Sequence, residues 1–267
     1  MKSKSILWVG IVVLLAGAGY YYWQHAQLDS AALTPPAKSA TSDGDANATQ
    51  YPVSAPADSA MPGSASSATP TTVPTLDHSD ETIEHLLSDL VGQQRFEALI
   101  NPQDLIRNFV ATTDNAKGSK LPSRVSPFKP LTGDFKVDQT ADGIVLSADN
   151  FARYTPYVDL LTSVDSQKLV NIYARYYPLF QAAYRDLGMS GYFNDRLVSA
   201  IDKTLAAPEP KGPIKLESVG YYRFADPDLE SRSIVQKILI RMGPQQEDLV
   251  KQKLKEWRGL LTHLNKK

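Results

Sequence analysis

The sequence predicts a mainly α-helical globular domain with a short β-hairpin and a candidate further strand, preceded by a single transmembrane helix and a disordered linker. An uncharged apolar run comes first, a stretch rich in Ala, Ser, Thr, Pro and Gly follows, and apolar residues at helical spacing fill the remainder. We therefore expect a cytoplasmic stub over residues 1–5, a transmembrane helix over 6–23, a linker over 24–75 and an extracytoplasmic domain over 76–267.

The apolar run over residues 6–23 is long enough to span a membrane. At about 1.5 Å per residue, a helix over this run and its flanks approaches the roughly 30 Å of bilayer hydrocarbon. Lys2 and Lys4 precede the run, and Tyr and Trp residues close it at positions 20–23. The positive-inside bias then predicts a single-pass protein of the bacterial cytoplasmic (inner) membrane, with a cytoplasmic N-terminus and a periplasmic domain.

A cleaved secretory signal is the alternative interpretation of the same segment. Ala16-Gly17-Ala18 has the small-x-small form of a cleavage site. The apolar run continues past Ala18 into the aromatic residues, which favours a retained anchor. Under either interpretation the domain is exported, and under the second it is a soluble periplasmic protein.

Low sequence complexity marks the linker. Between residues 30 and 75, 35 of the 46 residues are Ala, Ser, Thr, Pro or Gly, and Tyr51 is the only aromatic residue. Such a segment cannot bury enough apolar surface to offset its ordering entropy, so we expect disorder. As a flexible coil it reaches about 40 Å, which lets the domain search the space above the membrane.

The domain itself carries balanced charge and no cysteine. Residues 76–267 contain 25 Lys and Arg against 25 Asp and Glu, which argues against general nucleic-acid binding. The lack of cysteine in the chain excludes disulfides, thiol nucleophiles and cysteine-based metal sites.

Apolar periodicity and turn residues place the first elements of the domain. A first helix over residues 76–91 has Asp77 or Ser79 as its N-cap and Gly92 as its stop. A second helix is expected to start after Pro102, because proline pre-sets the backbone for a first helical turn.

A Pro- and Ser-containing loop over residues 117–130 leads to a β-hairpin whose turn is Asp142-Gly143. Asp165 is expected to cap a long helix that Gly188 ends. The later elements are helices over 154–164, 167–187 and 194–205, a strand region within 214–224, a helix from Asp226-Pro227 to about Met242, and a last helix from Pro244 to Leu264.

Two helical faces are assigned to the core. Tyr173, Tyr176, Phe180 and Tyr184 stand at helical spacing, and we interpret them as core packing rather than as a stacking platform for sugar rings. The last helix carries an apolar stripe around Trp257 among Lys and Arg residues. We expect this stripe to pack on its own domain rather than on an anionic surface or in a partner's groove.

Several short stretches resemble a bacterial family catalogued as domain of unknown function 3014. They are DLIRNFV at 104–110, NFARY at 150–154, YYPL at 176–179, FNDRL at 193–197, and YRFADP at 222–227 running on to RMGP at 241–244. The resemblance covers most of residues 76–257 and includes the arrangement of span, Pro/Ala-rich tether and domain. It implies the domain boundary and supplies no activity, cofactor or catalytic residue.

Charged residues inside or beside these stretches are the candidates for a functional site. The candidates for binding are Arg107, Arg153, Arg196, Arg223 and Arg241. The candidates for acid–base catalysis are Asp195 and Asp226. Buried Arg and Asp networks are commonly structural, so we expect most of these residues to pair within the domain.

A metal site is considered on the first helix and rejected. His78, Glu81 and His85 can share one helical face, but their spacing is not that of a His-Glu-x-x-His motif. Acidic residues in a first helical turn are explained by the helix dipole. We therefore predict no metal and no cofactor.

Together these features predict a binding or scaffold module for another cell-envelope component. A tether of this length raises the effective concentration of a binder and gives no advantage to an enzyme that acts on diffusible small molecules. The expected partners are the cytoplasmic membrane, through residues 6–23, and an envelope protein or the cell wall, with no nucleic acid. The alternative enzyme is a tethered hydrolase of wall polymers that uses Asp195 and Asp226.

Overall fold

A computed structural model describes residues 50–53 and 73–264 of the chain. Its helices are α2 (Asp80–Val91), α3 (Gln93–Leu99), α4 (Leu105–Asn115), α5 (Thr155–Ser163), α6 (Ser166–Asp186), α7 (Phe193–Leu205), α8 (Pro227–Glu230), α9 (Ile234–Arg241) and α10 (Pro244–Leu261). Short 3-10 turns are η2 (Leu76–His78), η3 (Ser123–Val125) and η4 (Ala148–Arg153). The strands are β1 (Val137–Thr140), β2 (Gly143–Leu146), β3 (Lys215–Ser218) and β4 (Tyr222–Phe224).

The predicted stub, the predicted span over residues 6–23 and most of the predicted linker lie outside the described residues. Within residues 50–53 and 73–264, none of the helices combines the length and the apolar character needed to cross a membrane.

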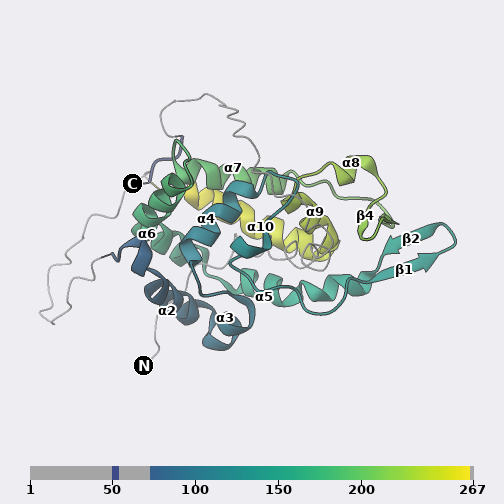
Figure 1. Cartoon of the computed structure of the whole chain (residues 1–267), viewed down its shortest axis with the longest axis horizontal. Coiled ribbons are helices and arrows are strands. Elements are labelled where there is room, and N and C mark those ends of the chain that lie inside the picture. The colour runs from purple at the N-terminus through teal and green to yellow at the C-terminus, as the bar shows by residue number, and fades with distance from the viewer. Residues whose placement is uncertain (1–49, 54–72, 265–267) are drawn as a thin grey trace, which may run out of the picture.

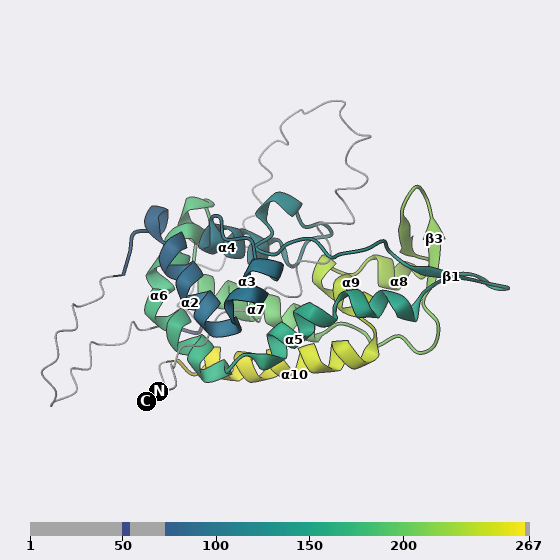
Figure 2. The same ribbon diagram turned by 90° about the horizontal axis from the view of Figure 1, so that it is seen from below.

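The last helix organises the helical body. α10 packs against α5, α6, α7 and α9, and Figure 2 shows it running lengthwise beside α5. Val250, Leu254 and Trp257 on its apolar stripe are fully buried, which confirms that the stripe packs on its own domain. The indole Nε1 of Trp257 donates a hydrogen bond of 2.8 Å to Ser166 Oγ at the start of α6. The helix ends at Leu261 rather than at the predicted Leu264.

Helix α6 carries the predicted tyrosine face. Tyr173, Tyr176, Phe180 and Tyr184 are all buried in the main core, so their interpretation as core residues is confirmed. The Asp165 carboxylate accepts a hydrogen bond from Lys168 N, as expected of its N-cap.

The strands form one antiparallel sheet in the order β1-β2-β3-β4, which projects from one end of the helical body in Figure 1. The predicted hairpin is confirmed as β1 and β2, with Thr140 paired to Gly143. Gly143 therefore opens β2, and the turn residues are Ala141 and Asp142, one residue earlier than the Asp142-Gly143 turn that we predicted. The strand region near 214–224 is two strands, because the chain reverses between Ser218 and Tyr222. One face of the sheet packs on α9, where Leu146, Leu216, Phe224 and Ile240 form a smaller second core.

Two predicted helix boundaries are wrong for local reasons. The second helix starts at Leu105 and not directly after Pro102, because the Asp80 carboxylate accepts from the amides of Asp104 and Leu105 at 2.7 and 3.0 Å. The helix predicted from Asp226 to Met242 is divided into α8 and α9. Ser233 and Gln236 form a capping box that starts a new helix there.

Helix α3 was not predicted. It follows α2 directly across Gly92, whose φ of 86° lets the chain change direction between the two helices. Phe96 of α3 is buried in the main core.

Candidate peptide-binding site

A four-residue segment from the predicted linker contacts the domain at the start of α7. The amides of Gln50 and Tyr51 donate to the two carboxylate oxygens of Asp195, at 3.0 and 2.8 Å. The Asn194 Nδ2 donates to the carbonyl of Tyr51 at 2.9 Å. Two neighbouring side chains of one helix thus bind three main-chain groups of a segment more than 140 residues away in the sequence.

The side chains of the segment alternate between the domain and solvent. Tyr51 and Val53 are partly buried and pack against the main core, whereas Pro52 is exposed. This alternation is typical of an extended chain. Pro52 supports that conformation, because a residue before proline is restricted to extended backbone angles.

The N-terminal turn of α7 suits Asp195 for this role. A carboxylate in the first turn of a helix is stabilised by the helix dipole. Asn194 is fully buried, and its Nδ2 also donates to the carbonyl of Leu261 at 3.3 Å, at the end of α10. The same amide therefore joins two helices of the domain and the docked segment.

Gln181 of α6 fixes the start of α7. This buried side chain accepts hydrogen bonds from Phe193 N at 2.9 Å and from the Tyr177 hydroxyl at 2.8 Å. Its Nε2 donates to the carbonyl of Gly191 at 3.0 Å. Because both ends of the Gln181 amide are satisfied, the loop before α7 has a defined position, and so do Asn194 and Asp195.

The phenols near Asp195, those of Tyr173 and Tyr177, are neutral. Burial raises the pKa of the Tyr173 hydroxyl well above its usual value, with smaller contributions from Tyr177 and Asp195. Burial likewise raises the pKa of Tyr177 to about 12. The guanidinium of Arg258 is paired with Asp202, which raises its pKa, and Tyr51 contributes in the same direction. An ion-paired cation therefore lies next to the aromatic residue of the docked segment.

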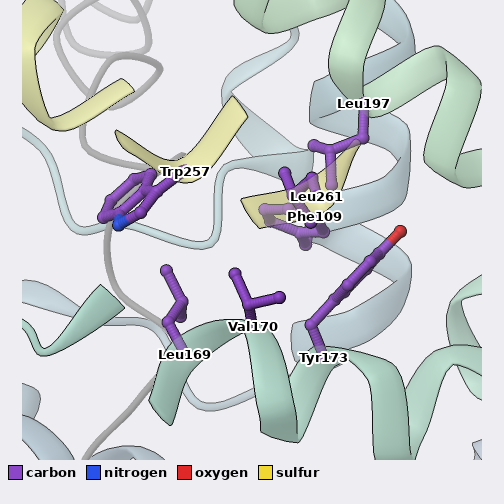
Figure 3. Close-up of a pocket in the computed structure, with 7 residues that line it drawn as sticks. All are labelled: Phe109, Leu169, Val170, Tyr173, Leu197, Trp257 and Leu261. Atoms are coloured by element: carbon purple, nitrogen blue, oxygen red, sulfur yellow. The ribbon is translucent and has the colours of Figure 1, made fainter. Parts of the chain in front are cut away.

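An apolar cavity of about 20 Å³ lies under this region. Figure 3 shows the side chains that face it, from α4, α6, α7 and α10: Phe109, Leu169, Val170, Tyr173, Leu197, Trp257 and Leu261. Its size is that of a water molecule and its lining is apolar, so it is a packing void of the core rather than a ligand pocket.

The turn that leads into α7 exposes three apolar side chains. Leu187, Met189 and Tyr192, on the turn between α6 and α7, are 44%, 39% and 44% exposed. Tyr192 is followed directly by Phe193 and Asn194. Exposed apolar residues on one short turn make this turn a candidate for contact with other molecules.

Two of the candidate arginines hold helices together near this end. The Arg196 guanidinium binds Asp114 of α4, with 2.9 Å from its Nε to Oδ1 and 2.5 Å from its Nη2 to the main-chain carbonyl. Arg107 bridges Asp77 and Asp186 at 2.5 and 2.7 Å. Both arginines therefore have ion-pair partners within the domain.

The other candidates lie at the sheet end. Arg153 donates to the main-chain carbonyls of Thr132 and Gly133 and to the side chain of Asn150. Arg241 is buried, with its guanidinium carbon 4.8 Å from the ring centre of Phe224. Arg223 and Glu217 form an exposed cross-strand pair at 2.8 Å.

The two candidate catalytic carboxylates serve different elements. Asp226 Oδ1 accepts from Asp228 N at 2.8 Å and caps α8, whereas Asp195 binds the docked segment. In Figure 1, α8 lies beside β4 at the sheet end, and α7 starts next to α6 at the other end. The structure does not bring these two residues together through any contact that it describes.

The three residues considered for a metal site, His78, Glu81 and His85, do not share one helix, because His78 belongs to η2 and precedes α2. His85 Nδ1 lies 3.3 Å from Asp89 Oδ2. Among the described residues, no group of three or more His, Cys, Asp or Glu side chains has the geometry to hold a metal ion.

The residues that sequence reasoning missed are Asn194 and the segment Gln50–Val53. Asn194 is uncharged and lay outside the set of charged candidates, although it belongs to the FNDRL stretch. The signal for the segment was Tyr51, an aromatic residue followed by Pro52 and Val53 in a linker with no other aromatic residue.

Comparison with known proteins yields a family. The profile of the family described as "Protein of unknown function (DUF3014)" matches residues 105–258, more than half of the chain. The match confirms the resemblance drawn from the short stretches, and it includes Asn194 and Asp195. No curated protein and no solved structure matches the chain.

Proposed function

We propose that this chain, which belongs to the DUF3014 family, is a membrane-tethered binding module that holds an extended polypeptide segment of another cell-envelope component. The observation that carries the proposal is the contact of Gln50–Val53 with Asn194 and Asp195. In that contact, polar side chains of the domain bind main-chain groups of the segment, and alternate side chains of the segment pack on the domain surface. Peptide-recognition domains bind extended ligands through the same division of roles.

The surface beside the site supports a contact larger than four residues. Leu187, Met189 and Tyr192 expose apolar area on the turn that leads into α7. A partner segment that continues past the Asn194–Asp195 pair would bury this area, which adds apolar burial to the main-chain hydrogen bonds.

The predicted N-terminal anchor determines where in the cell the module acts. Attachment to the inner membrane through residues 6–23, with the domain in the periplasm, restricts the search for a partner to the space above the membrane. Tethering of this kind raises effective concentration and suits a binder of modest intrinsic affinity.

The alternative function, hydrolysis of wall polymers by Asp195 and Asp226, gains no support from this geometry. Glycosidic hydrolysis requires two carboxyl groups that face one substrate bond. Here each carboxylate accepts main-chain hydrogen bonds at a different element.

Site-specific photocrosslinking in the intact bacterial envelope tests the proposal. A photoreactive residue in place of Tyr192, beside the site, is expected to crosslink the full-length protein to an envelope polypeptide. The matched control is Tyr221, which is 40% exposed next to β4 at the sheet end. Addition of Asp195→Ala is expected to reduce the crosslink at position 192. Identical products from both positions, or none at 192, would refute the proposal.

A further inference from the structure

The site that we propose for a partner is filled by the chain's own segment. Both carboxylate oxygens of Asp195 accept hydrogen bonds from the amides of Gln50 and Tyr51, and Asn194 Nδ2 donates to the Tyr51 carbonyl. A second segment cannot make the same three hydrogen bonds at the same time. We infer that the partner's segment has the chemistry of Gln50–Val53, an aromatic residue, proline and an aliphatic residue, and that Gln50–Val53 competes with it.

This inference rests on the proposed function, and its first step concerns the main chain. The paired acceptors of Asp195 require amide N–H groups on two successive residues, so proline is excluded at the first two positions of a ligand. Asn194 requires the carbonyl of the second residue. Asn194 Nδ2 also donates to the carbonyl of Leu261, so the domain itself helps to orient this donor.

The second step concerns the side chains of the ligand. Tyr51 and Val53 pack against the main core from alternate positions, so the site selects bulky apolar groups two residues apart. Pro52 points to solvent and selects the extended conformation of the residue before it.

The third step concerns competition within one chain. Residues 54–72 connect the docked segment to the domain at Val73. Covalent connection over such a distance typically gives an effective concentration on the order of 1 mM. If the segment binds with a dissociation constant of about 0.1 mM, the site is occupied about ten to one in the absence of a partner. The internal segment then sets a threshold that a partner must exceed.

A binding experiment on the full-length chain in detergent tests both parts of the inference. The probe is a fluorescent peptide of sequence Thr-Gln-Tyr-Pro-Val-Ser, which copies residues 49–54. The two proteins are the wild type and a released variant, Tyr51→Pro with Val53→Ser, which lacks one amide donor and both packing side chains. We expect the released variant to bind the peptide about tenfold more tightly than the wild type does.

Two controls tie the binding to the described contacts. A peptide methylated at the tyrosine amide nitrogen keeps every side chain and the glutamine amide but loses the donor to Asp195 Oδ1, and we expect it to bind neither protein. Asp195→Ala in the released background is expected to lose peptide binding while the far-ultraviolet circular dichroism of the domain is unchanged.

The outcomes separate this inference from the proposed function. Equal affinities of the wild type and the released variant would overturn the competition and leave the peptide site standing. If neither protein binds the peptide although the released variant is folded, the inferred ligand chemistry is overturned. In that case crosslinking at position 192 still reports on the proposed function. Dimers that form only in the wild type would show that a second copy's segment fills the site, which also overturns competition within one chain.

Discussion

At the start of α7, Asn194 and Asp195 bind the main chain of a segment that lies outside the domain, whereas at the sheet end Arg153, Arg241 and Asp226 bind groups of the domain itself. Both ends are built from stretches that resemble the same family. The difference teaches that a charged residue within such a stretch is informative only once its partner is known. We therefore expect changes at the sheet end to affect stability and changes at the start of α7 to affect docking.

The largest effect is expected from Gly243→Ala at the sheet end. Gly243 has a φ of 82°, and an added Cβ would lie 2.5 Å from the ring of Phe151. Backbone strain and overpacking together should lower the free energy of unfolding by about 2–4 kcal/mol. Gly220→Ala is the matched control, since its φ is 86° but an added Cβ meets nothing within 4 Å. Equal losses in chemical denaturation would show that the contact with Phe151 is unimportant.

Asn194→Ala should affect both stability and docking. The change removes hydrogen bonds to Leu261 and Tyr51 from a fully buried position, so we expect a loss of about 1–3 kcal/mol in unfolding free energy. Asn171→Ala, on the exposed face of α6, should change it by less than about 0.5 kcal/mol. A stable Asn194→Ala variant with protected amides at Gln50 and Tyr51 would argue against the role assigned to Asn194.

Asp195→Ala and Asp226→Ala should have separate effects. Loss of the α8 cap at Asp226 is expected to cost about 1 kcal/mol of unfolding free energy without affecting the docked segment. Asp195→Ala is expected to abolish the hydrogen-exchange protection of the Gln50 and Tyr51 amides. If Asp226→Ala exposed these amides, or Asp195→Ala left them protected, the division between the two ends would be wrong.

The smallest effect is expected from Pro52→Ala. The Pro52 side chain is exposed, so the change acts mainly through the greater freedom of the undocked segment. Docking should weaken by about 0.4–1 kcal/mol, and the unfolding free energy of the domain should change only by that amount. The exchange rates of the Gln50 and Tyr51 amides measure it, and a tighter docked state would contradict the pre-organising role of proline.

Much of the fold follows from local sequence pattern. The tyrosine face of α6, the stripe of α10 and the hairpin were predicted because their periods of about 3.6 and 2 report which side is buried. The starts of α4 and α9 were missed because they depend on capping groups, the Asp80 carboxylate and the Gln236 side chain. Such caps are set by tertiary position or by one hydrogen bond, and periodicity does not encode them.

The site was predicted only in part, for a related reason. Asp195 was a candidate for catalysis, and in the structure its carboxylate accepts hydrogen bonds from the amides of Gln50 and Tyr51, a contact that the spacing of residues cannot report. The segment Gln50–Val53 was missed because composition is averaged over many residues. Its contact with the domain involves only four residues, with two half-buried side chains and three hydrogen bonds. A single aromatic residue beside proline in an otherwise polar linker is the pattern to look for.

Chemical-shift mapping tests the central claim most directly. The ¹⁵N-labelled released variant would be titrated with the unlabelled Thr-Gln-Tyr-Pro-Val-Ser peptide and with its N-methylated form. The account predicts that the side-chain amide of Asn194 and the main-chain amides of Asp195 and Arg196 shift with the first peptide only. Shifts confined to β1–β4 and η4, or equal shifts with both peptides, would contradict it.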